Sequence, residues 1–75
     1  MLNITLRQLH SIQAISRFGK ISNAAKVLGL TGPAVTLQLK QLEDTLGISL
    51  FDRTSSGMRL TAAGELTLEC ADRIV

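Results

Sequence analysis

The sequence predicts a mainly α-helical domain made of three helices, a two-stranded hairpin and a fourth helix. Three observations support this. Apolar residues recur at helical spacing in the first part of the chain, and a glycine follows each periodic segment, at Gly19, Gly29 and Gly47. After Gly47 the pattern changes to two short strands joined by turn residues. This order of elements is a winged helix-turn-helix, and 75 residues suffice for one such domain.

The first helix is predicted between Thr5 and Gly19. Thr5 and Gln8 fit a capping box, in which the threonine hydroxyl accepts from an early amide and the glutamine side chain reaches back. The apolar stripe of this helix consists of Leu6, Leu9, Ile12, Ile15 and Phe18. A second, shorter helix is predicted to start at Ser22 and to end at Gly29.

The third helix is predicted over residues 31–46. Pro33 lies in its first turn, where a missing amide hydrogen costs nothing. One face of the helix carries the apolar stripe Val35, Leu39, Leu42 and Leu46. Because only residues 29–31 separate this helix from the second one, the pair has the form of a helix-turn-helix.

The remaining residues predict a wing and a fourth helix. Strands are expected over residues 48–53 and 58–60, with turn residues at 54–57 between them, and Thr61 is expected to cap the last helix. We therefore divide the chain into a winged helix-turn-helix, residues 1–60, and the start of a further helix, residues 61–75. This last helix has no stop signal, so we expect the chain to be part of a longer protein.

Charge is distributed unevenly along the chain. Residues 1–42 carry five basic side chains and no acid, whereas residues 43–75 carry three basic and six acidic side chains. A basic half predicts contact with a polyanion. The alternative is that these dispersed cations are simply solvated.

Composition excludes several classes of protein. One cysteine and one histidine are too few for a disulfide or a structural zinc site, and we expect no cofactor. Paired carboxylates, a phosphate loop and metal-ligand spacing are all missing from the sequence, which predicts that the protein is not an enzyme. The single cysteine suits a reducing cytoplasm, and since an apolar run of about 20 residues is also missing, we expect no membrane contact.

The outer face of the third helix is the strongest candidate for a binding site. Opposite the apolar stripe, at 100° per residue, lie Pro33, Thr36, Leu37, Lys40, Gln41 and Asp44. Small, hydroxyl, amide and ammonium groups suit a helix whose first turns enter the major groove of DNA. We expect Thr31, Thr36, Gln38 and Lys40 to donate to bases or phosphates, and free amides at the helix start to bind an anion. An ordinary solvated face has the same periodicity.

The chain resembles, over nearly its whole length, the DNA-binding domain of LysR-type transcriptional regulators. The motifs that carry the resemblance are Ala24-Ala25, Thr31-Gly32-Pro33-Ala34-Val35-Thr36, Leu42-Glu43, Leu46-Gly47-Ile48-Ser49-Leu50-Phe51-Asp52-Arg53 and Leu60-Thr61-Ala62-Ala63-Gly64. The opening TLRQL and the PAVT segment are similar to the members of this family that control carbon-fixation operons.

The resemblance implies binding to double-stranded DNA on an interrupted inverted repeat. Residues 31–46 would enter the major groove, and the wing, residues 50–60, would lie near the backbone or minor groove. The DNA-contacting residues that the resemblance implies are Thr31, Pro33, Thr36, Arg53 and Arg59. Together with the outer-face residues Gly32, Leu37, Gln38 and Lys40, they make up the nine contacts that we expect. For Arg53 the alternative is a structural ion pair with a nearby acid.

The resemblance also implies a homodimer, formed through the fourth helix as a linker helix. Its implied interface residues are Ala63, Leu66, Cys70 and Ile74, and we interpret Cys70 as an interface residue rather than a redox switch. A C-terminal domain that binds a small-molecule effector is expected outside this chain. A tetramer of the full-length protein and contacts with RNA polymerase are further expectations of the same origin.

Two positions depart from the family pattern. Gly32 stands where glutamine is common and Leu37 where arginine is common, so two usual readers of adenine and guanine are missing. Leu37 could instead pack on a thymine methyl group, and Gly32 could let the backbone approach DNA closely. The alternative is that Leu37 is one of the isolated exposed apolar residues found on any protein.

A second class of function stays open at this stage. Winged-helix domains can act purely as protein–protein interaction modules, and a low net charge of +2 together with Leu37 would favour that use. The basic first half and the Thr31-x-Pro33-x-x-Thr36 start of the third helix favour DNA.

Overall fold

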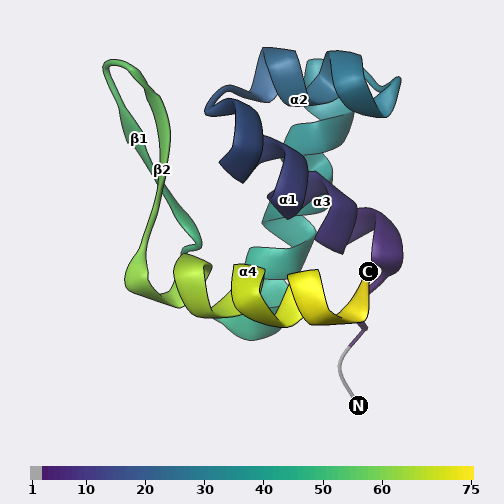
Figure 1. Cartoon of the computed structure of the whole chain (residues 1–75), viewed down its shortest axis with the longest axis vertical. Helices are drawn as coiled ribbons and strands as arrows, with labels where there is room; N and C mark the ends of the chain where they lie inside the picture. The colour runs from purple at the N-terminus through teal and green to yellow at the C-terminus, as the bar shows by residue number, and fades with distance from the viewer. Residues whose placement is uncertain (1–2) are drawn as a thin grey trace.

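The computed structural model describes residues 3–75 as four helices and one antiparallel hairpin (Figure 1). The elements in chain order are α1 (Leu6–Phe18), α2 (Ile21–Leu28), α3 (Gly32–Leu46), β1 (Phe51–Thr54), β2 (Gly57–Leu60) and α4 (Ala62–Ile74). The winged helix-turn-helix predicted from the sequence is confirmed. In Figure 1 the tip of the hairpin and α2 lie at one end of the molecule, and α4 crosses the other end.

The helix boundaries follow mostly from local signals. The capping box at Thr5 and Gln8 is confirmed, because both of its hydrogen bonds form. The glycines that end α1, α2 and α3 are confirmed as caps: Gly19, Gly29 and Gly47 have φ of 73°, 68° and 71°. Other residues rarely adopt this left-handed conformation, so the three glycines set where the helices stop.

The start predicted for α2 is wrong. The helix begins at Ile21, one residue before Ser22, and its N-cap residue Lys20 makes no side-chain capping hydrogen bond. Tertiary contacts fix this start instead. The amide of Met58 in β2 donates to the carbonyl oxygen of Gly19 at 2.7 Å, and Ile21 packs against the core. The α1–α2 turn is therefore stabilised by the hydrogen bond from the wing, and not by a capping side chain.

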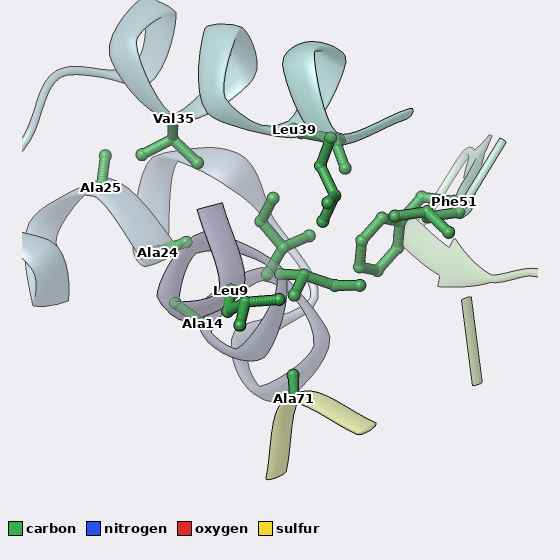
Figure 2. Close-up of a cluster of buried hydrophobic side chains, with 12 residues drawn as sticks. Leu9, Ala14, Ala24, Ala25, Val35, Leu39, Phe51 and Ala71 are labelled. Atoms are coloured by element: carbon green, nitrogen blue, oxygen red, sulfur yellow. The ribbon is translucent and has the colours of Figure 1, made fainter. Parts of the chain in front are cut away.

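The core lies where α1, α2 and α3 meet, and β1 and α4 close it (Figure 2). Its buried apolar residues are Leu9, Ile12, Ala14, Ile15, Ala24, Ala25, Val35, Leu39, Leu42, Leu50, Phe51 and Ala71. The stripe predicted for α3 is confirmed, with Leu46 only partly buried. The stripe predicted for α1 is wrong at both ends, since Leu6 and Phe18 are exposed. Both are terminal residues of the helix.

The first strand begins later than the sequence predicts. Residues 48–50 are not strand, because the amide of Leu50, which would extend the ladder toward Thr61, bonds to another group. The amide of Leu50 donates to the Glu43 carboxylate at 2.7 Å, and its carbonyl oxygen accepts from the Thr61 amide at 3.0 Å. The hairpin turn is also shorter than expected, since Thr54 and Gly57 pair with each other.

Helix α4 is anchored at its first turn. The Thr61 hydroxyl accepts from the Gly64 amide at 3.0 Å, as predicted for a cap, and donates to the Ser49 carbonyl oxygen at 2.7 Å. Gly64 is buried so closely that a Cβ there would overlap the carbonyl oxygen of Leu50. Within residues 3–75, no helix combines the length and apolar character needed to cross a membrane.

Candidate nucleic-acid interface

Burial of one side of α3 leaves the other side free. Val35 and Leu42 are fully buried and Leu39 is 5% exposed, which fixes the rotation of the helix about its axis. On the outer side Pro33, Leu37 and Lys40 are exposed and Thr36 is half-buried. The predicted outer face is therefore confirmed as solvent-accessible.

The first turn of α3 is held by Thr31. Its hydroxyl oxygen accepts from the Ala34 amide at 3.2 Å, and its carbonyl oxygen accepts from the Val35 amide at 3.1 Å. Thr31 is exposed, and its hydroxyl hydrogen can still be donated outward. Free amides remain at this helix start. Pro33 has none and those of Ala34 and Val35 bond to Thr31, but the amides of Thr31 and Gly32 have no partner among the described hydrogen bonds.

A shallow hollow lies on this face, where three elements meet. Its lining residues are Ile21 from α2, Gly32, Pro33, Thr36, Leu37 and Lys40 from α3, and Arg53 from β1. Residues far apart in the sequence thus share one surface, which combines apolar side chains with two cationic ones, Lys40 and Arg53. Six of the nine residues expected to contact DNA are brought together here.

Gln38 lies outside this hollow. It is half-buried, and one residue beyond Leu37 it is rotated by about 100° around the helix. Gln41, on the same side of α3, accepts a long hydrogen bond of 3.4 Å from the buried Gln8 side chain. This flank of α3 therefore packs toward α1.

The two wing arginines lie on opposite faces of the hairpin. Arg53 pairs with Met58, and Arg59 pairs with Asp52. Since side chains alternate along a strand and paired residues share a face, Arg53 lies on the side that faces α3, while Arg59 and Asp52 lie on the other. Asp52 is thus badly placed for an ion pair with Arg53. Arg59 lines a separate hollow with Gly19 and the hairpin turn.

Ile21 is the member of this surface that sequence reasoning missed. The expected helix start at Ser22 left Ile21 in a loop. A usable signal was present, because Ile21, Ala24 or Ala25, and Leu28 follow the spacing of one helical face.

A second accessible surface runs along α4. Leu66, Cys70 and Ile74 border an apolar groove with Ile4, Leu9, Leu42, Leu46, Thr67 and Ala71. Leu66 and Ile74 are 66% and 64% exposed. The fourth residue expected at this interface, Ala63, instead packs against the core. The acids on α4 lie away from the hollow, and Asp72 accepts a hydrogen bond from Gln13 at 2.9 Å.

Comparison with known proteins assigns the family. Residues 6–65 match the family described as "Bacterial regulatory helix-turn-helix protein, lysR family". The chain belongs to this family. It is 55% identical over 99% of its length to the HTH-type transcriptional regulator CbbR of Rhizobium meliloti (strain 1021), and 43% identical over 84% to the RuBisCO operon transcriptional regulator of Allochromatium vinosum. It spans 24% and 21% of these two relatives.

A solved structure of this family with DNA has the same fold. The CbnR_DBD–DNA complex aligns with a TM-score of 0.89 and 41% sequence identity, covering 93% of this chain and 80% of that one. The fold of the chain is thus that of a LysR-family DNA-binding domain, and its relatives are named transcriptional regulators.

Proposed function

We propose that the chain binds double-stranded DNA as the recognition domain of a dimeric bacterial transcriptional regulator. In this proposal the first turns of α3 enter the major groove, and the wing lies along the backbone and the adjacent minor groove. Two protomers bind the two halves of an interrupted inverted repeat.

The observation that carries this proposal is the surface around the hollow. It joins the outer face of α3 to Arg53 of the wing, so that a helix narrow enough for the major groove is flanked by cations that can reach phosphates. Thr36 and Lys40 supply donors on the helix itself. Thr31 and Gly32 add a hydroxyl and an amide at the helix start.

The opposite placement of the two wing arginines supports different roles for them. Arg53 faces α3 and would contact the phosphates beside the groove that α3 enters. Arg59 faces away and would contact the next stretch of backbone or the minor groove. Phosphate contacts of this kind position a domain on the duplex without reading its sequence.

The groove along α4 supports dimerisation through residues 61–75. Leu66, Cys70 and Ile74 leave apolar surface in water at the end of the domain away from α2. A second copy of the same helix would cover it around a twofold axis. Such a dimer presents two copies of α3 to two half-sites, which one domain alone cannot do.

The relatives support a more specific role in the whole protein. One of them is named for the RuBisCO operon, and we propose that this chain likewise acts in a regulator of carbon-fixation genes. In that proposal the protein is cytoplasmic and is not an enzyme. An effector-binding domain follows residues 61–75, and contacts with RNA polymerase and a tetrameric state belong to that longer protein.

Salt dependence of binding to duplex DNA tests the proposal. Lys40, Arg53 and Arg59 in two protomers would neutralise about six phosphates, which gives a slope of log K against log[salt] of about −5. Fluorescence anisotropy with a labelled duplex from the control region of a carbon-fixation operon measures this slope. A slope near zero, or no binding to that duplex, contradicts the proposal.

The rival function is a protein–protein interaction module. It is favoured by the 54% exposure of Leu37 inside a partly apolar hollow. The same salt titration distinguishes the two functions, because a surface that binds an apolar protein segment does not bind duplex DNA with a steep salt dependence.

A further inference from the structure

Helix α4 rests on the rest of the domain along a narrow seam. The residues that it buries are Gly64 and Ala71, both small. Hollows lie on both flanks of this seam: Leu66 borders the apolar groove described above, whereas Leu68 and Asp72 border a second hollow, formed with α1 and α2. Packing of this kind fixes the angle of a helix only weakly, because none of the large side chains of α4 is fully buried.

Hydrogen bonds hold α4 at two places. Its first turn is fixed through Thr61, whose hydroxyl donates to the carbonyl oxygen of Ser49 at 2.7 Å. About three turns further on, Nε2 of Gln13 in α1 donates to Oδ1 of Asp72 at 2.9 Å. Within residues 3–75, this is the one hydrogen bond that joins the body of α4 to another element, and both of its residues line the second hollow. The first turn therefore acts as a pivot, and the Gln13–Asp72 bond limits rotation about it.

The angle of α4 has a large effect at the far end of the molecule. In Figure 1 α4 crosses one end, and α2 with the first turns of α3 lies at the other. The molecule is 32 Å long along its longest axis. Over most of that length, a rotation of about 10° at α4 moves the first turns of α3 by about 4 Å, which exceeds the rise of about 3.4 Å per base pair. A small change in this angle thus shifts α3 by a whole step of the duplex.

We propose that the Gln13–Asp72 hydrogen bond sets the angle of α4 on the domain and so fixes the spacing between half-sites that the dimer accepts. The inference rests on the proposed binding of DNA by a dimer formed through α4. In that dimer the second copy would cover the groove bordered by Leu66, so the hollow spanned by this hydrogen bond is the flank that stays open. Gln13 and Asp72 are then positioning residues, which set the separation of the two copies of α3 without contacting DNA.

The test uses a duplex selected from a random library by the chain. In a series of further duplexes, the spacer between the two half-sites is one or two base pairs longer or shorter. A change of one base pair must strain or break this hydrogen bond in both protomers. Two such bonds correspond to about a tenfold change in affinity, so the wild-type chain should lose at least about tenfold at each change. Fluorescence anisotropy measures the spacing profile.

Two variants remove the hydrogen bond from either side. Asp72→Ala removes the accepting oxygen, and Gln13→Ala removes the donor. In both, the loss for a change of one base pair should shrink to about threefold or less, while affinity for the selected spacer stays within about threefold of wild type. The double variant should behave like either single one, because both substitutions remove the same bond.

Two controls separate the hydrogen bond from the charge of Asp72. Asp72→Asn removes the same charge but keeps a carbonyl oxygen that can accept from Gln13, so it should keep the wild-type spacing profile. Glu69→Ala removes another exposed acid of α4, one that borders neither hollow, and should also keep the profile. Circular dichroism and sedimentation equilibrium check that folding and dimerisation are unchanged.

The outcomes distinguish this inference from the function on which it rests. If Asp72→Ala and Gln13→Ala keep the wild-type profile, or if the wild-type chain is indifferent to spacing, the inference alone is overturned. The same holds if Asp72→Asn relaxes the profile as much as Asp72→Ala, because the charge is then responsible. If the wild-type chain selects no duplex at all, both the inference and the proposed function are wrong.

Discussion

The outer face of α3 and the open face of α4 both expose leucine, but they differ in what surrounds it. Leu37 shares its hollow with Lys40 and Arg53, whereas Leu66 borders an almost wholly apolar groove on a helix that carries Glu65 and Glu69. The α3 surface, with its two cations, suits a polyanion that also presents an apolar group. The α4 surface suits an apolar partner, and its acidic side chains disfavour DNA.

The difference shows how one short chain can carry two separate surfaces. Helix α3 is deeply buried along one side, which fixes the direction of its outer face, and its first turns lie at the end of the molecule where α2 lies, while its last turns reach α4. Helix α4 buries only Gly64 and Ala71, which leaves most of its apolar side chains uncovered. The surfaces of α3 and α4 thus differ both in charge and in how much of their apolar area is covered.

The largest expected effect concerns the α4 surface. In the proposed dimer, replacing Leu66 by serine would remove one buried leucine from each half of the twofold interface, at about 1.5 kcal/mol or more each. We expect dimerisation to weaken roughly a hundredfold, measured by sedimentation equilibrium. Val27→Ser is the matched control, because Val27 is similarly exposed on α2. If both substitutions weakened dimerisation equally, Leu66 would not lie in the dimer interface.

The next effect concerns the joint that connects the two regions. In Gly64→Ala the added methyl group overlaps the carbonyl oxygen of Leu50, and we expect a loss of about 1–3 kcal/mol in unfolding free energy. In Gly32→Ala the new group meets no atom within 4 Å, so stability should stay the same or rise by up to about 1 kcal/mol. Urea denaturation measures both, and a stable Gly64→Ala would contradict the close packing described for α4.

The smallest effect concerns one charge on the surface proposed to face DNA. Arg53→Gln should lower affinity for every duplex alike and reduce the salt slope by about one per protomer. Arg73→Gln makes the same charge change in the last turn of α4 and should leave the slope nearly unchanged. Anisotropy titrations at several salt concentrations compare the two. If Arg73→Gln changed the salt slope more than Arg53→Gln does, the DNA would contact α4 and not the surface of α3 and the wing.

Most of the fold could be predicted because its signals are local. The glycines at 19, 29 and 47, the caps at Thr5 and Thr61, and the stripe of α3 each act within a few residues. The strand start at Phe51 could not be predicted, since it depends on the Glu43 carboxylate taking the Leu50 amide. That hydrogen bond joins two elements that the periodicity treats separately.

The candidate site was only partly predictable for the same reason. Helical spacing identified Pro33, Thr36 and Lys40, because all three lie on one face of one helix. It could have extended α2 to Ile21, but it could not place Ile21 beside these residues, since they meet only through the packing of α2 on α3. Nor could it separate Arg53 from Arg59, because their faces depend on the pairing register of the wing.

Cross-saturation by nuclear magnetic resonance tests the central claim most directly. In a complex of the perdeuterated chain with duplex DNA, saturation of the sugar protons attenuates only those amides that lie against the DNA. We predict attenuation at Thr36, Leu37, Lys40 and Arg53 and none at Glu69 or Arg73. Attenuation along α4 with an unaffected α3 would contradict the assignment of the two surfaces.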